Sequence, residues 1–398
     1  MKTYIEGSSK IGILTRRLLK IFRLERVTIA YGKARVKTKI LMQSRRCQKP
    51  IFESRSVYFY LLFFTCICSL TVRAENLTEP LSVVIIGKGP AGLATAIEAK
   101  SQGAEVCIVE KRKGATRQQT LFLRESSLNL LKKWQVCPSQ LSVVTIQDRQ
   151  IGVVPIHNLE EGMEKRAQEL GIQILHGEFL HFHDGKIKIS HDGEEVLLPY
   201  DIIVAADGAH SKVRDALGIQ CTLFGEVKGH SAFIPLAESQ SNIGIGDPIK
   251  INGFFLRKIG FATGSIIFAQ RVLDSRANEP ISEKEFQELL KACNLDKECQ
   301  SYEEKKANVL SDITITLQQA MTFSDEKKRA IVVGDAAATA SFFKGMGANT
   351  ALKAAALAGE FFSRIQKHDM DPYTPFNLKM KGATDELIDD SKFLFCSE

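Results

Sequence analysis

The stretch Val83–Arg112, VVIIGKGPAGLATAIEAKSQGAEVCIVEKR, decides the fold of this chain. Its β-branched start is typical of a buried parallel strand, and the turn GKGPAG follows directly. The apolar spacing after the turn predicts a helix, and EVCIVEK predicts a second strand. The sequence therefore predicts an α/β fold with a parallel sheet and a dinucleotide site at the turn.

The glycine-rich turn is predicted to hold a pyrophosphate. Gly87 allows the tight turn, Gly89 lets the backbone approach the pyrophosphate, and Gly92 permits close packing of helix on strand. The helix N-terminus favours the negative charge. Glu110, at the end of the second strand, is placed to accept hydrogen bonds from a ribose diol, which favours FAD or NAD over NADP. The predicted contacts in the turn are Gly87, Gly89, Pro90, Ala91 and Gly92.

Two later segments each place an acidic residue after a predicted strand. LPYDIIVAADGAHSKVRDALG, from Leu198, leads through a strand to Asp207 and Gly208 and then into a helix start. AIVVGDAAATASFFKGMGANTALKAAALAGEFF, from Ala330, leads through a strand to Gly334 and Asp335 and then into a long Ala-rich helix. A carboxylate at the carboxyl end of a strand can hold a sugar hydroxyl. Asp-Gly before a helix is also an ordinary turn, which is the alternative at Asp207.

The three motifs GxGxxG, DG and GD, in this order and at these separations, resemble the group A flavoprotein monooxygenases of the para-hydroxybenzoate hydroxylase fold. The resemblance covers residues 82 to about 217 and 328 to 367. It implies a Rossmann-like FAD-binding domain in which Asp207 and Gly208 help bind the cofactor and Asp335, after Gly334, contacts the ribityl chain or pyrophosphate. It also implies that Gly345, Gly347, Ala348 and Asn349 bring a helix N-terminus to the pyrimidine edge of the flavin. A plain helix-cap loop with Asn349 as the cap is the alternative.

The segment EKRKGATRQQTLFL, from Glu110 to Leu123, resembles the corresponding segment of the MICAL flavin monooxygenases, where Glu-Lys-Arg is followed by Arg and two Asn. Gln in place of Asn keeps the amide and lengthens the side chain. A solvated basic loop is the alternative. The resemblance implies that the adenosine and pyrophosphate side of FAD is lined by Glu110, Lys111, Arg112, Arg117, Gln118 and Gln119.

Two positions depart from the family pattern. Many relatives carry Arg at the start of the helix before the third strand, where this chain has His157 and Asn158, so a permanent charge is missing. The Pro that usually follows GD is replaced by Phe342, which, with Phe343, is expected either to wall the flavin face or to fill the core. No residue is assigned a catalytic role, because an isolated His such as His157 is more often structural.

The resemblance implies that FAD, reduced by NAD(P)H, reacts with O2 to form a flavin C4a-hydroperoxide that hydroxylates a small aromatic or apolar substrate. The protein would orient the cofactor and exclude water. No second GxGxxG unit is evident, which fits transient binding of NAD(P)H. Two alternatives stay open: a MICAL-like oxidase that makes hydrogen peroxide or oxidises a protein methionine, and a flavin-binding interaction protein without turnover.

The region between the DG and GD motifs, residues 219–327, carries the β-like runs SAFIPL, IKINGFF and SIIFAQRVL and a capping box from Ser282 to Glu285. We expect an inserted β-sheet substrate domain here, with a dry pocket supplied by several phenylalanines: Phe233, Phe254, Phe255, Phe261 and Phe268. The FAD-binding domain is expected to comprise residues 81–218 and 328–368, between a leader (1–80) and a C-terminal tail (369–398).

The leader indicates membrane targeting. SVYFYLLFFTCICSLTV, Ser56–Val72, is uncharged and apolar, follows a basic segment and precedes Val-Arg-Ala, the order of a secretory signal. Its length is also close to the ~20 residues that span a bilayer as a helix. A cleaved signal and a retained anchor stay open, so an exported or membrane-anchored protein is expected, with a cytoplasmic protein as the alternative.

Charge and cysteine usage exclude two classes of function. The net charge of +7 comes from residues 1–74, with 16 Lys and Arg against three Asp and Glu; the rest holds 37 basic and 43 acidic residues. A nucleic-acid partner is therefore not expected for the main body. The nine cysteines show no metal-ligand spacing, so no metal site is expected. Cys293 and Cys299 are near enough to pair in an oxidising compartment, but free thiols are favoured.

Overall fold

The computed structural model describes residues 80–114, 119–146, 148–236, 244–261, 264–305, 309–342 and 345–395. The signal-like segment 56–72 lies outside the described residues, as do Arg117, Gln118 and Phe343. No helix within the described ranges has the length and apolar character that crossing a bilayer requires. The described cysteines, Cys293 and Cys299 among them, are free thiols.

The predicted dinucleotide unit forms the centre of a six-stranded sheet. β1 (Ser82–Ile86) leads into α3 (Pro90–Ser101) and β2 (Glu105–Glu110). The strand order is β17-β18-β10-β1-β2-β6. β6 (Gln173–His176), β10 (Ile202–Ala205) and β18 (Ala330–Val332) continue the parallel arrangement, and β17 (Ser324–Asp325) is antiparallel at one edge. This confirms the predicted Rossmann-like α/β fold.

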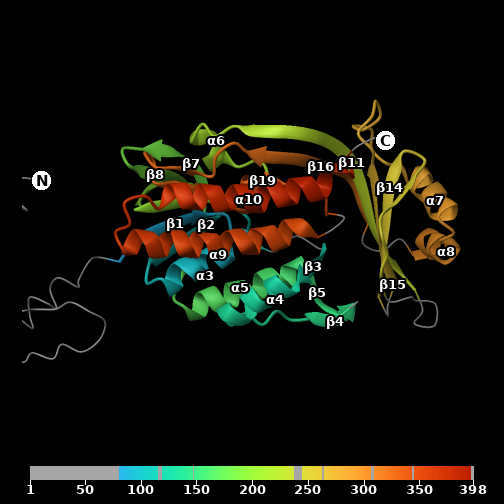
Figure 1. The fold of residues 1–398 in the computed structure, drawn as a ribbon, viewed down its shortest axis with the longest axis horizontal. Helices are drawn as coiled ribbons and strands as arrows, with labels where there is room; N and C mark the ends of the chain where they lie inside the picture. The colour runs from blue at the N-terminus through green and yellow to red at the C-terminus, as the bar shows by residue number, and fades with distance from the viewer. Residues whose placement is uncertain are drawn as a thin grey trace, which may run out of the picture. The chain divides into compact units, whose positions relative to one another are not determined.

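Helices with small and apolar faces cover this sheet. α3 packs against α9 (Met346–Gln366) and α5 (Ile156–Glu169), and α10 (Tyr373–Lys392) lies beside α9 (Figure 1). Residues 369–398, expected only as a tail, thus contain a 20-residue helix. Its apolar side chains recur at helical spacing, and the Phe376 ring lies 5.4 Å from that of Phe361 on α9.

Two small antiparallel sheets are inserted between the parallel strands. β3 (Thr120–Arg124), β5 (Arg149–Pro155) and β4 (Ser142–Ile146) form one, with α4 (Glu125–Trp134) between β3 and β4 in the chain. β7 (Glu178–His183), β8 (Lys186–His191) and β9 (Glu194–Pro199) form the other.

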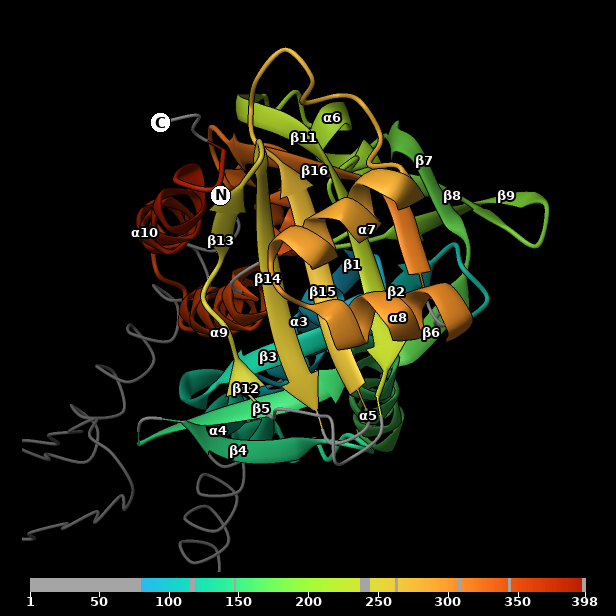
Figure 2. The same cartoon turned by 90° about the vertical axis from the view of Figure 1, so that its right-hand side faces the viewer.

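The segment between DG and GD forms most of an antiparallel sheet of order β12-β14-β15-β11-β16-β19, with β13 beside β14. α7 (Glu283–Ala292), which begins with the predicted capping box at Ser282, and α8 (Asp296–Lys305) cover one face (Figure 2). The other face packs on Phe122 of β3 and Phe342 before α9. The strands are β11 (Cys221–Pro235), β12 (Gly244–Ile245), β13 (Ile249–Ile251), β14 (Phe254–Phe261), β15 (Gly264–Arg271), β16 (Val309–Ala320) and β19 (Ala338–Thr339).

Candidate functional site

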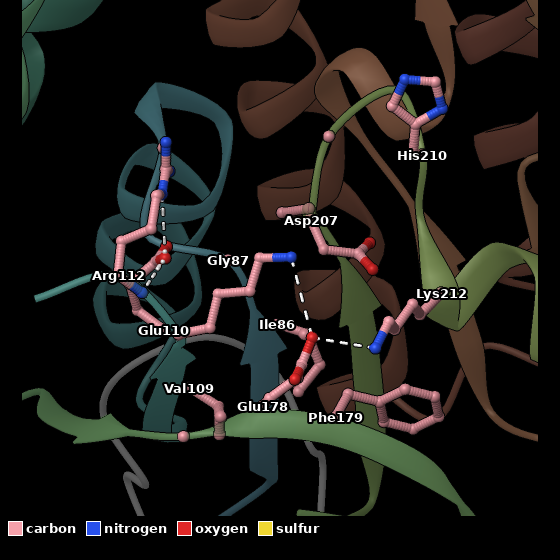
Figure 3. Close-up of a pocket in the computed structure, with 15 residues that line it drawn as sticks. Ile86, Gly87, Val109, Glu110, Arg112, Glu178, Phe179, Asp207, His210 and Lys212 are labelled. Atoms are coloured by element: carbon pink, nitrogen blue, oxygen red, sulfur yellow. Dashed lines mark hydrogen bonds and ion pairs between the residues drawn. The ribbon is translucent and has the colours of Figure 1, made fainter. Parts of the chain in front are cut away.

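The three sequence motifs meet at one edge of the parallel sheet. β1, β2, β10 and β18 all end there, because parallel strands share a carboxyl edge. β1 pairs with β2 on one side and, on the other, with β10, which comes much later in the chain, so the strand order reverses at β1. Ligands of doubly wound folds bind in the crevice at such a switch point. A pocket of about 180 Å³ lies here, with Gly87, Glu110 and Asp207 among its lining residues (Figure 3).

The glycine-rich turn leaves a cradle with no side chain in it. Gly87 has a φ of +107°, and a Cβ there would lie 2.3 Å from the carbonyl oxygen of Ala206. A Cβ on Gly92 would lie 2.0 Å from the Gly87 carbonyl oxygen, so this glycine allows α3 to approach the turn. A Cβ on Gly89 would meet no atom within 4 Å. Gly89 is the N-cap of α3 and has no side-chain cap, so the helix N-terminus faces open space that fits a phosphate group.

Pro90 and Ala91 form the first buried turn of α3. Pro90 at the first helical position needs no hydrogen-bonded N–H. A Cβ on Gly334, whose φ is +62°, would lie 2.5 Å from the Cβ of Ala91. The GD segment therefore packs directly on the helix that begins at the glycine-rich turn.

Glu110 is held as a carboxylate at the end of β2. Its Oε2 accepts a hydrogen bond from the backbone N–H of Lys88 (2.7 Å), and its Oε1 accepts from the backbone N–H (2.8 Å) and Nε (3.1 Å) of Arg112. Burial raises the pKa of Glu110, but the hydrogen bonds from Arg112 and Lys88 outweigh it and hold the pKa below its usual value. A carboxylate has about four acceptor positions, so Glu110 can still accept from a sugar hydroxyl.

Glu178, the first residue of β7, connects two lysines beside the pocket. Its Oε1 lies 2.9 Å from Lys212 Nζ and 3.7 Å from Lys111 Nζ, and Figure 3 shows Glu178 and Lys212 below Asp207. The hydrogen bond from Lys212 is the main cause of a lowered pKa of Glu178. Sequence reasoning found Lys111 but missed Glu178 and Lys212, since no motif marks the start of β7 or α6 (Lys212–Ala216).

Asp207 faces the pocket and also closes the turn before α6, while its predicted contact with the cofactor stays a prediction. It lines the pocket, and it also accepts hydrogen bonds from Ser211 Oγ and from the backbone N–H of Val213 (3.3 Å), which close the turn before α6. Burial raises the pKa of Asp207, and the hydrogen bond from Ser211 offsets part of the rise. Gly208, with a φ of +91°, also lines the pocket.

A buried arginine ties the DG segment to the GD segment. Arg214 Nη1 donates to the carbonyl oxygens of Ala209 (3.1 Å) and Ala336 (3.2 Å). Gly334 and the exposed Asp335 follow β18 in a short 3₁₀ turn, Gly334–Ala336. Two segments that are more than 100 residues apart are thus fixed to each other at the carboxyl edge.

Both the oxygen and the nitrogen of the Asn349 side-chain amide, on α9, make hydrogen bonds to neighbouring residues. Its Oδ1 accepts from the N–H of Arg124 (2.8 Å) and from Ser127 Oγ (2.6 Å), and its Nδ2 donates to the carbonyl oxygens of Phe122 (2.7 Å) and Gly345 (2.7 Å). It is not the helix cap, because the N-cap is Gly345, with a φ of +64° and no side-chain hydrogen bond. A flavin contact of Asn349 itself stays a prediction.

The remaining predicted contacts, at the end of α9 and on the adenosine side, differ in exposure. A Cβ on Gly347 would meet no atom within 4 Å, and Ala348 is partly buried. Gln119 is exposed, and its carbonyl accepts from the N–H of Ile156 (2.9 Å). The structure therefore brings Lys111 and Arg112 to the pocket and leaves Gln119 outside its lining.

The structure shows how the residues at the two positions that depart from the family pattern are placed. Asn158 is buried at the start of α5 and donates to Ser139 Oγ (2.6 Å), while His157 is partly buried. The Phe342 ring lies 4.9 Å from that of Phe268 on β15. Of the phenylalanines predicted for a dry pocket, Phe254 packs under the helices, whereas Phe255 and Phe268 face the FAD-binding side.

Comparison with known families identifies this architecture. Residues 138–363, more than half of the chain, match a family described as FAD binding domain, and residues 82–137 match a second family with the same description. The chain is 28% identical to the FAD-dependent monooxygenase OpS4 of Beauveria bassiana (strain ARSEF 2860), over 172 aligned positions. This alignment covers 36% of the chain and 40% of that relative, so the chain spans well under half of its length.

Solved structures share the fold at low identity. CabE, an aromatic hydroxylase from angucycline biosynthesis, superposes with a TM-score of 0.62 at 15% identity over 79% of this chain and 69% of its own. The Diels-Alderase PyrE3 of pyrroindomycin biosynthesis superposes with a TM-score of 0.60 at 19% identity over 78% of this chain and 72% of its own. Likenesses at this identity concern the fold, and their differing activities illustrate that fold does not fix function.

Proposed function

Because the chain belongs to the family of FAD-dependent monooxygenases with the para-hydroxybenzoate hydroxylase fold, we propose that it uses NAD(P)H and O2 to hydroxylate a small aromatic or apolar molecule. FAD is the cofactor of this family. One observation carries the proposal: four parallel strands end at the same edge of one sheet, where Glu110 is the last residue of one strand and Gly87, Asp207 and Gly334 follow the other three. When bound, the flavin supplies the redox and oxygen chemistry.

The chain's own residues then have distinct tasks in binding. The open backbone at Gly89 and the N-terminus of α3 receive the pyrophosphate, and the ionised Glu110 accepts from ribose hydroxyls. The uncapped N-terminus of α9 at Gly345 stabilises negative charge near it. The apolar face that carries Phe268 and Phe342 keeps water away from a substrate.

The proposal is tested first with purified protein in excess FAD. We expect a yellow protein with a flavin spectrum that bleaches when NADH or NADPH is added without oxygen. In air, a panel of aromatic substrates should yield one molecule of hydroxylated product per NAD(P)H. Peroxide in place of product, stimulated by a protein partner, would favour the MICAL-like alternative. Bound flavin with no NAD(P)H oxidation would favour an interaction protein.

Substitutions at two glycines test whether the FAD pyrophosphate binds at the glycine-rich turn. A Cβ fits sterically at Gly89, whose φ is −75°, so Gly89→Val should fold but place a side chain where the pyrophosphate approaches. We expect FAD affinity to fall by at least about 100-fold, since close backbone approach is lost. The matched control is Gly382→Ala on α10, where a Cβ also meets no atom within 4 Å. Equal FAD affinity in both variants would contradict the placement of the cofactor.

A further inference from the structure

Side chains on the FAD-binding side of the antiparallel sheet lie in rows, and each row consists of residues that are directly opposite in neighbouring strands. Because side chains alternate along a strand, Ile266, Phe268 and Gln270 of β15 share this face and belong to three successive rows. The row of Phe268 packs against Phe342, and the centroids of the two rings are 4.9 Å apart. The row of Gln270 comes directly after it along the sheet.

The segment that directly follows α10, residues 393–395, covers the row of Gln270. Phe255 of β14 is directly opposite Gln270 in the strand register. The Phe393 ring stands edge-on to the Phe255 ring, with 6.2 Å between the centroids. Leu394 is completely buried and belongs to the same apolar cluster as Phe255. The 393–395 segment therefore closes one end of the apolar surface that carries the aromatic pair.

Buried hydrogen bonds fix the 393–395 segment to the loop before α9. The side-chain amide of Gln270 is buried, and its Nε2 donates to the carbonyl oxygen of Leu394 (2.8 Å). Its Oε1 accepts from Ser341 Oγ (2.8 Å), and Ser341 comes directly before Phe342. One amide thus connects this segment to the residues that lead to the N-terminus of α9.

A glycine on β11 makes room for the last residue of the segment. The strand register shifts at Gly225, and a Cβ there would lie 3.0 Å from Cδ1 of Phe395 and 3.1 Å from Cδ2 of Leu273. The carbonyl oxygen of Phe395 accepts from the N–H of Leu273 (3.1 Å). Phe395 is therefore packed on the backbone of β11. Because protein interiors are close-packed, a ligand ring can enter this row only by displacing the 393–395 segment.

We propose that the 393–395 segment is the end wall of the substrate site and sets the upper size of the aromatic molecule that the site accepts, with Leu394 as the specificity-determining residue. A ring that packs against Phe268 and Phe342 gains binding free energy from the apolar area it buries. Successive rows on one face of a strand are roughly 7 Å apart, so a longer ring system meets Leu394 in the next row. This inference narrows the substrate class of the proposed function by size and rests on that function.

The test compares two neutral phenols of different size, 2-naphthol and the larger 1-hydroxypyrene. Equilibrium dialysis measures their binding to the full chain loaded with FAD, and a change in the flavin spectrum shows that the bound probe lies beside the cofactor. We expect wild-type protein to bind 2-naphthol at least about 10-fold more tightly, because the larger probe must displace buried side chains. Leu394→Ala should leave the affinity for 2-naphthol unchanged. It should raise the affinity for 1-hydroxypyrene by at least about 10-fold, which corresponds to the burial of about two additional CH2 groups.

Two further variants keep the test decisive. Leu290→Ala on α7 is the matched control, because Leu290 is equally buried but packs on the opposite face of the same sheet. Its truncation also leaves a cavity, so it separates an opened end wall from a general loss of packing, and it should keep the wild-type preference. Phe393 is 45% exposed, so Phe393→Ala should fold even if Leu394→Ala does not. We expect Phe393→Ala to raise the affinity for 1-hydroxypyrene by about 3-fold.

Four results would overturn the inference. Wild-type protein would bind both phenols equally, or it would bind neither. Alternatively, Leu394→Ala and Phe393→Ala would both keep the wild-type preference, or Leu290→Ala would lose it to the same extent.

The proposed function and this inference fail separately. Dialysis needs no turnover, so a size limit that depends on Leu394 would stand even if NAD(P)H did not bleach the protein. Conversely, a chain that binds FAD, hydroxylates an aromatic molecule and keeps its size limit in both variants of the segment would overturn only the end wall.

Discussion

Asn349 on α9 accepts a hydrogen bond from Ser127 on α4 (2.6 Å), and its amide also joins β3 through Phe122 and Arg124. One side chain thus fixes the segment around β3 against the helix end that the family resemblance assigns to the flavin. Asn349 therefore aligns the elements around this helix end, and its own contact with the flavin stays a prediction.

Asn349→Asp is expected to lower the free energy of unfolding by about 2–4 kcal/mol at pH 7, because a carboxylate oxygen would face the carbonyl oxygens of Phe122 and Gly345 in a buried place. Ser127→Ala removes one of the two donors to Oδ1 and should cost only about 1 kcal/mol. Urea unfolding of both variants measures the difference. Equal stabilities would show that the four-bond arrangement is not what holds these elements together.

Gly359→Ala is expected to be destabilising by about 1–3 kcal/mol, because an added Cβ on α9 would lie 2.5 Å from Oε2 of the buried Glu98 on α3. Glu98 cannot easily move away, since its Oε1 accepts from Trp134 Nε1 (2.7 Å) and from Lys133. Thermal unfolding checks this against Gly382→Ala on α10, which meets no atom and should gain up to about 1 kcal/mol from helix propensity. The opposite ranking of the two variants would contradict the close packing of α3 on α9.

The motifs that meet at the carboxyl edge of the sheet could be recognised in the sequence because they depend on local rules. A Gly at a positive φ, such as Gly87, and an acid after a β-branched run, such as Glu110, are visible within a few residues. Glu178 could not be found this way, since its ion pair with Lys212 joins residues that are 34 positions apart in the chain. The apolar residues of α10 recur at helical spacing in the sequence, but the packing of α10 against α9 depends on contacts that the local sequence does not specify.

The buried His230 is expected to make stability depend on pH between about 4 and 6.5. His230 on β11 is 1% exposed, lies 4.3 Å from Phe286 of α7 between ring centroids, and has no hydrogen bond to either ring nitrogen within the described structure. Burial lowers its pKa to about 4, with the charge of Glu283 opposing. In the unfolded chain His230 is protonated as the pH falls through 6.5, whereas in the folded chain it is protonated only near pH 4. The contribution of neutral His230 to stability is therefore complete above pH 6.5 and is lost as the pH falls.

His230→Leu removes both the titrating group and the two unpaired nitrogens. Between pH 7 and pH 4.5 the free energy of unfolding should fall in both proteins, and the fall should be smaller in the variant than in wild type by on the order of 2 kcal/mol. Urea unfolding at these two pH values measures the change, and intrinsic fluorescence combined with circular dichroism tests that the transition stays two-state. His183→Gln on β7, whose side chain is 47% exposed, is the matched control and should follow wild type. A His230→Leu protein with the same pH dependence as wild type would mean that this imidazole does not govern the acid lability of the sheet and its two covering helices.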